Sequence, residues 1–143
     1  MDIAGSCHCG NISFTLGWPG EVAEVPARSC DCTFCVKHGG VWTSNPQASL
    51  RVRLSDAGAV ARYAFGTETA DFLVCARCGV APLVTSRIED QVYAVVNVNT
   101  FDGFDRARLR AAPASFEGED VASRLDRRKR HWIADVTLAE GGA

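Results

Sequence analysis

Apolar and polar residues alternate along much of this chain with the period of two that is typical of β-strands. The alternation predicts strands over residues 11–16, 50–55, 61–65, 70–75 and 131–138. The segment "QVYAVVNV", residues 91–98, is apolar on both sides, which predicts a strand at the centre of a sheet. Turn-forming sequences such as "GWPG" and "HGG" separate these strands, and "GTET" joins two of them as a hairpin loop.

Helical periodicity is weak by comparison. Residues 118–130, "GEDVASRLDRRKR", predict one short helix, because acidic residues in its first turn and basic residues in its last suit the helix dipole. Its apolar stripe is limited to Val121, Ala122 and Leu125. The patterns together predict a mainly-β fold with little helix. A length of 143 residues is that of a single domain, residues 1–143.

Composition and charge narrow the classes of function. Apolar residues make up 47% of the chain, yet no run approaches the roughly 20 apolar residues of a membrane helix. A net charge of −2 gives no overall electrostatic reason to bind nucleic acid. The start "MDIAGSCHCG" has neither the basic nor the apolar region of a secretory signal, so we expect a cytoplasmic protein.

Seven cysteines are many for a chain of this size, and they fall into three groups. An odd number without an export signal argues against disulfides, and clustered cysteines in a reducing compartment are commonly metal ligands or catalytic groups. A thioredoxin-like redox role is disfavoured because a βαβ pattern around "CARC" is missing. The groups are Cys7 and Cys9 in "CHCG", Cys30, Cys32 and Cys35 in "CDCTFC", and Cys75 and Cys78 in "CARCG".

Two ways of pairing these groups are open. In the favoured one, Cys7, Cys9, Cys75 and Cys78 close a four-sulfur structural zinc site, which leaves three sulfurs for a second site with an open fourth position. That division uses every thiol. In the other pairing, Cys75 and Cys78 join two sulfurs of "CDCTFC", and the N-terminal pair is idle.

The order and spacing of "CHCG", "CDCTFC" and "CARCG" resemble the glutathione-dependent formaldehyde-activating enzymes, over roughly residues 5 to 105. The resemblance implies twisted antiparallel sheets clipped by a structural zinc on the outer four cysteines. It also implies a second, catalytic zinc on Cys30, Cys32 and Cys35. We expect two Zn²⁺ ions in the chain, the second of them labile because three ligands leave it open to exchange.

The family reaction joins glutathione and formaldehyde into S-hydroxymethylglutathione, and its reverse breaks a carbon–sulfur bond. The resemblance therefore implies a carbon–sulfur lyase with glutathione as co-substrate and a small-molecule adduct of formaldehyde or another small aldehyde as substrate. The chain departs from the family at Asp31, where relatives often have histidine, and at "TFDGFD", residues 100–105. A different substrate would follow if those positions touch it.

Less specific features keep alternatives open. His38 and Asp31 are the candidate proton donors, and His38 or His8 could instead close a second structural site. A non-catalytic zinc module that binds a partner is the alternative function. The basic run at residues 124–131 is usually a solvated face, although it could hold the carboxylates of glutathione or a nucleic-acid backbone. Trp18, Trp42 and Trp132 are expected to pack in the core or at its rim rather than to form a glutathione platform.

Overall fold

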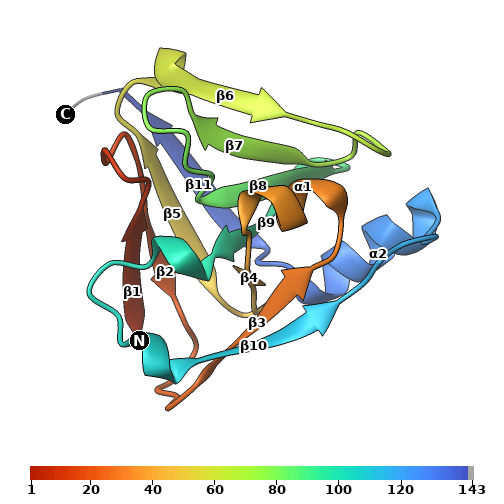
Figure 1. The fold of residues 1–143 in the computed structure, drawn as a ribbon, viewed down its shortest axis with the longest axis horizontal. Helices are drawn as coiled ribbons and strands as arrows, with labels where there is room; N and C mark the ends of the chain where they lie inside the picture. The colour runs from red at the N-terminus through yellow and green to blue at the C-terminus, as the bar shows by residue number, and fades with distance from the viewer. Residues whose placement is uncertain (142–143) are drawn as a thin grey trace.

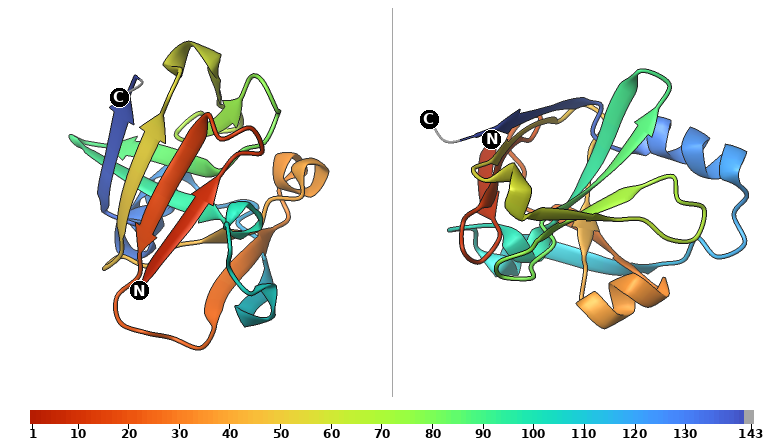
Figure 2. Two further views of the ribbon diagram at one scale, coloured as in Figure 1. Left: turned by 90° about the vertical axis from the view of Figure 1, so that its left-hand side faces the viewer. Right: turned by 90° about the horizontal axis from the view of Figure 1, so that it is seen from above.

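The computed structural model describes residues 1–141, which form two twisted β-sheets and two α-helices (Figure 1). The smaller sheet has four strands in the order β1-β2-β5-β11, and Figure 2 (left) shows them side by side with the larger sheet behind. Its strands are β1 (Asp2–Ser6), β2 (Ile12–Gly17), β5 (Ser49–Leu54) and β11 (Asp135–Glu140).

The larger sheet has seven strands in the order β10-β3-β4-β9-β8-β7-β6. The segment 91–98 forms its middle strand, which confirms the prediction of a central position. The strands are β3 (Val25–Cys30), β4 (Trp42–Thr43), β6 (Val60–Tyr63), β7 (Asp71–Cys75), β8 (Leu83–Ile88), β9 (Gln91–Asn97) and β10 (Leu109–Ala114).

The mainly-β prediction is confirmed, but the sheets are mixed rather than wholly antiparallel. β10 pairs with β3 and β11 pairs with β5 in parallel, while the remaining strand pairs are antiparallel. A parallel pair requires a crossover through other elements, and local alternation carries no information about such a connection. The predicted hairpin of β6 and β7 is present and antiparallel.

The helices are α1 (Thr33–His38) and α2 (Val121–His131), and three short 3₁₀ turns cover Ala57–Ala59, Val98–Thr100 and Arg106–Arg108. α2 confirms the predicted helix: the Asp120 carboxylate accepts the backbone N–H of Ser123 at 2.7 Å and caps its first turn. The strand predicted over 131–138 is shifted to Asp135–Glu140, because the helix continues through His131. No helix in residues 1–141 is long and apolar enough to cross a membrane.

Two hydrophobic clusters form the core. The larger one includes Trp18 and the apolar residues of β1, β2 and β5, together with parts of β8 and β9. The smaller one gathers Trp42, Phe72 and Trp132 near Cys35 of α1, with Leu125 of α2 packed against it. Cys30, Cys32 and Cys35 pack with this second cluster, whereas Cys7 and Cys75 lie in the first.

Candidate active site

The outer four cysteines meet at one point, as the favoured pairing predicts. The sulfurs of Cys7, Cys9, Cys75 and Cys78 all lie within 4.8 Å of one another. The distance between the Cys7 and Cys9 sulfurs is 3.8 Å, and that between the Cys9 and Cys75 sulfurs is 3.5 Å. Four sulfurs bound to one zinc ion at about 2.3 Å would be about 3.8 Å apart, so this donor set fits tetrahedral zinc.

Two glycine-ended turns hold these thiols. Gly10 donates its backbone N–H to the carbonyl of Cys7, and Gly79 donates to the carbonyl of Cys75 at 2.8 Å. Both glycines have positive φ, 86° and 79°, a conformation that side chains with Cβ rarely adopt. The chain therefore reverses sharply after each pair, and β1 and β7 bring the two turns together.

Two of the outer thiols, Cys7 and Cys78, have pKa values shifted in opposite directions. Burial raises the pKa of the Cys7 thiol to about 12. Burial also opposes ionisation of Cys78, but the backbone N–H groups of Val80 and Cys9 and the neighbouring thiols outweigh it and lower the pKa of Cys78 to about 6. A site of this kind binds a cation by releasing protons from its remaining thiols.

The second group of thiols lies where β3 passes into α1. Cys30 is the last residue of the strand, Cys32 caps the helix, and Cys35 is buried in its first turn. The backbone N–H of Cys35 donates to the Cys32 sulfur at 3.3 Å. All three sulfurs lie within 4.8 Å of one another, and no fourth His, Cys, Asp or Glu atom of residues 1–141 joins them.

Hydrogen bonding distributes charge unevenly within this triplet. The Cys35 thiol donates to the Cys30 sulfur and lowers the pKa of Cys30 to about 6, while the pKa of Cys35 is raised by the same contact and by burial. The indole Nε1–H of Trp42 points at the Cys35 sulfur from 3.3 Å. The triplet is therefore a preformed group of sulfurs in which the Cys30 thiol is more acidic than the Cys35 thiol.

A cavity of about 530 Å³ opens directly onto the three-thiol group. Cys30, Cys32 and Cys35 all line it, whereas none of the outer four cysteines does. Aromatic rings form much of the remaining wall, and they come from Trp42, Phe65, Phe72, Phe116 and Trp132. The two sulfur groups thus differ in their access to the cavity. The outer four cysteines connect two strands, whereas the three-thiol group faces a space large enough for a small ligand.

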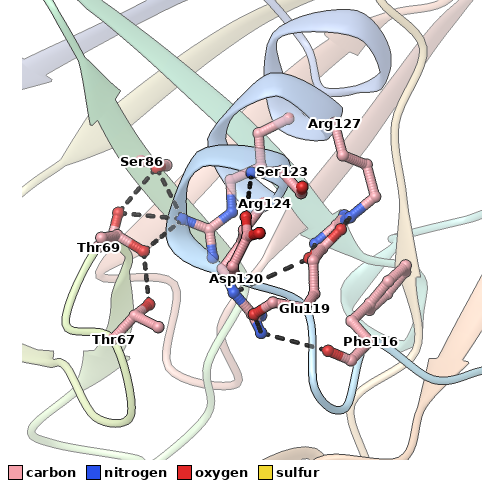
Figure 3. A network of polar contacts seen from close by, with 10 residues as sticks. Thr67, Thr69, Ser86, Phe116, Glu119, Asp120, Ser123, Arg124 and Arg127 are labelled. Carbon is pink, nitrogen blue, oxygen red and sulfur yellow. Dashed lines mark hydrogen bonds and ion pairs between the residues drawn. The ribbon is translucent and has the colours of Figure 1, made fainter.

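Part of the cavity wall is cationic, which corrects the prediction of a solvated basic face for three arginines of the run. Arg124, Arg127 and Arg128 of α2 line the cavity together with Arg28 of β3. Figure 3 shows Arg124 and Arg127 turned toward Glu119, with Phe116 beside them. From the same run, Lys129 and Arg130 remain at the surface.

The candidate proton donors and the tryptophans differ in their position relative to the cavity. Asp31 lines the cavity, but His38 does not; it is exposed at the end of α1, where its ring stacks on Phe34 at 5.1 Å. His8 is exposed and joins neither sulfur group. Trp18 is a core residue as predicted, whereas Trp42 and Trp132 pack in the core and also form cavity wall.

Sequence reasoning missed Arg28 and the aromatic wall. Arg28 precedes Cys30 by two residues on the same strand, so both side chains lie on one face of the sheet. The spacing would have placed Arg28 beside Cys30 if this strand had been predicted. Apolar and polar residues do not alternate clearly in "EVPARS", so the strand was not predicted. Phe65 and Phe116 lie in loops 51 residues apart, and no local pattern connects them.

The fold and the site define a small mainly-β protein with one four-sulfur group between strands and one three-sulfur group that faces a cavity. A family model described as "Glutathione-dependent formaldehyde-activating enzyme" matches residues 2–117, and the chain belongs to this family. The crystal structure of a Rhodobacter sphaeroides protein is similar, with 31% sequence identity and a TM-score of 0.59. The match covers 77% of this chain and 97% of that one.

Proposed function

We propose that this protein is a carbon–sulfur lyase that forms and cleaves the adduct of glutathione with formaldehyde or another small aldehyde. The observation that supports the proposal most directly is the opening of the three-thiol group onto a cavity of about 530 Å³. Three protein ligands and an accessible fourth position characterise catalytic zinc, whereas four ligands characterise structural zinc. Membership of the family supports glutathione and formaldehyde as the reactants.

Zinc fits both groups by the chemistry of their donors, since soft thiolates favour it over hard cations such as magnesium. Cys7, Cys9, Cys75 and Cys78 would hold the structural ion. Cys30, Cys32 and Cys35 would hold the catalytic ion, which when bound favours the thiolate form of a substrate thiol and so supplies a nucleophile at neutral pH.

The chain's own groups would orient the reactants and move the proton. In the forward direction the thiol loses its proton and its sulfur forms a bond to the aldehyde carbon. The carbon–oxygen π bond breaks, and the oxygen takes up one proton to become the hydroxyl of the adduct. The Asp31 carboxyl lines the cavity and is the group we assign to that proton transfer, since His38 lies outside it. The aromatic wall excludes water from the adduct.

The same chemistry favours the cytoplasm as the site of action. All seven cysteines are free thiols, and glutathione is the abundant thiol of reducing compartments. The alternative, a zinc module that binds a partner through its basic run, loses support because three arginines of that run line the cavity. A partner surface would require them at the exterior.

Exchange spectroscopy by NMR on mixtures of ¹³C-formaldehyde and glutathione tests the proposal. The protein should accelerate interconversion of adduct and free reactants above the spontaneous rate, and Cys32→Ser should return it to that rate. Cys32→Ala serves as a second variant without any ligand atom. Acceleration that survives in both variants would overturn the assignment of the site.

A further inference from the structure

The helix that supplies the cationic wall lies outside the matched family region. The family match ends at residue 117, and α2 begins at Val121. Arg124, Arg127 and Arg128 of this helix nevertheless line the same cavity as the three thiols. The cavity is therefore lined by residues inside and outside the matched region.

Arg128 is the most deeply placed of these side chains, with 6% of its surface exposed. Its Nη1 donates to the hydroxyls of Thr69 and Ser86, at 2.9 and 3.1 Å, and to the Thr69 carbonyl. Its Nε is buried without a hydrogen-bond partner, as is the Nε of Arg124. No carboxylate forms an ion pair with Arg128 within residues 1–141, and a buried cation without a counter-ion is costly.

Arg127 pairs with one carboxylate among residues 1–141, that of Glu119. Glu119 accepts from Arg127 Nε at 3.0 Å and from Nη2 at 3.1 Å, and it lies 3.8 Å from Arg124. The guanidinium also lies over the Phe116 ring, 3.7 Å from its centroid. A single carboxylate thus serves two arginines, and neither Arg28 nor Arg128 takes part in the pairing.

Arg28 connects this wall to the thiols. It is half-buried, and its Nη2 donates to the Ser44 hydroxyl at 3.0 Å. Burial is the main cause that lowers the pKa of Arg28. The charge of Arg127 lowers this pKa further, and Cys30 raises it. The cavity is therefore lined by the three thiols, by Arg28 two residues before Cys30, and by the arginines of α2. Asp31 and Glu117, the acidic residues that line the cavity, are both exposed.

We infer that Arg28, Arg127 and Arg128 form an anion subsite that binds a carboxylate group of the substrate. The substrate is then an adduct that carries its carboxylate within reach of the thiol end, either on the thiol-bearing part or on the aldehyde-derived part. Arginine is suited to this role because its planar donors match a carboxylate at two points. The identity of the reaction rests on the proposed function, but binding of the anion does not.

A purely structural role for the arginines is the competing interpretation, in which they only fix α2 to the sheet. The two roles predict different results for a ligand that lacks both thiol and aldehyde. Succinate, a small dicarboxylate, is the probe, and Trp42 and Trp132 in the cavity wall provide a fluorescence signal. Its binding should be saturable and should weaken with added salt.

Arg127→Gln and Arg28→Gln should each bind succinate roughly tenfold more weakly, because each removes a charged hydrogen bond to the anion. Arg130→Gln is the matched control, since Arg130 lies on the same helix, is 61% exposed and pairs with Asp126. Glu119→Gln should bind more tightly, because it frees Arg127 from its carboxylate. No saturable binding by the wild type, or equal affinity in all four variants, overturns the inference.

Cys32→Ser separates this inference from the proposed function. That variant should lose acceleration of adduct exchange and keep succinate binding. If the wild-type protein binds succinate but shows no catalysis in any assay, the anion subsite is supported and the lyase activity is contradicted. If it accelerates adduct exchange but does not bind succinate, the lyase activity is supported and the subsite is contradicted.

The source of the carboxylate follows from the Michaelis constants of Arg127→Gln. A raised KM for glutathione, but not for the neutral thiol 2-mercaptoethanol, places the carboxylate on the thiol. A raised KM for the anionic aldehyde glyoxylate, with formaldehyde unaffected, places it on the aldehyde. Both outcomes support the subsite, and a KM unchanged for every pair contradicts it.

Discussion

Trp42 donates its indole N–H to the sulfur of Cys35 across 3.3 Å, the one polar contact from the aromatic wall to the thiols among the described residues. Trp42 reaches this position from β4, a strand of two residues between β3 and β9. The indole fills the smaller core cluster and at the same time orients a sulfur of the cavity. Core packing and the chemistry of the site thus depend on one side chain.

Trp42→Phe should keep the fold and weaken metal binding at the three-thiol group. Phenylalanine retains most of the apolar contact but has no donor for the Cys35 sulfur, and loss of such outer-shell partners typically costs about 10- to 100-fold in metal affinity. Competition with a colorimetric chelator measures the change. Trp132→Phe, which alters the same cavity without a hydrogen bond to sulfur, should have a smaller effect.

Zinc should leave the protein in two stages. Four thiolates enclose an ion, whereas three leave it open to solvent and chelators. Mild chelation is expected to remove about one equivalent with the β-sheet circular dichroism unchanged, and a second should follow only with unfolding. Release of both ions in a single step with loss of structure would contradict the four-plus-three division.

The two sulfur groups should differ in their importance for folding. Cys78→Ser opens the cluster that joins β1 to β7, and we expect it to yield unfolded or aggregated protein, because metal binding at such a joint is coupled to folding. Cys32→Ser should remain folded with one zinc. Circular dichroism with metal analysis compares them, and equal loss of structure in both would mean that the triplet is structural.

Glu119 should give the protein a pH-dependent part of its stability. Hydrogen bonds from Arg127 hold the pKa of Glu119 below its ordinary value of 4.5. Its stabilisation is therefore complete above that value and is lost as the pH falls through the lower pKa of the folded state. Urea unfolding should place Glu119→Gln about 1 kcal/mol below wild type at pH 7, with the difference shrinking as the pH falls below 4.5. A difference independent of pH would exclude the ion pair as its cause.

Glutathione should release close to one proton when it binds at neutral pH. Its free thiol is mostly protonated there, and a thiol that joins the triplet's metal is not. Calorimetry in two buffers of different ionisation enthalpy measures the release. S-methylglutathione, which has no thiol proton and is a poor ligand, should bind far more weakly; equal affinity for both compounds would place the sulfur away from the metal.

Local pattern was sufficient for much of the sheet. The strands β2, β5, β7 and β9 were predicted because each has a clear arrangement of apolar positions, and α2 because of its charged ends. The missed strands were β1, β3, β4, β8 and β10, and β10, "LRAAPA", illustrates why. It contains proline, is mostly exposed and lies at the edge of the sheet, so burial imposes no alternation on it.

The chain by itself determined the three cysteine groups, because their spacing and the glycines that follow two of them are properties of short turns. Which groups meet was left open between two pairings, and the structure brings Cys7 and Cys9 to Cys75 and Cys78. Only the tertiary structure decided which face of α2 meets the cavity. The contacts that orient Arg128 come from Ser86 and Thr69, 42 and 59 residues away, and they turn a run of basic residues that is normally solvated toward the thiols. Such contacts depend on how β7 and β8 lie under the helix, and a one-dimensional pattern of charge does not specify that arrangement.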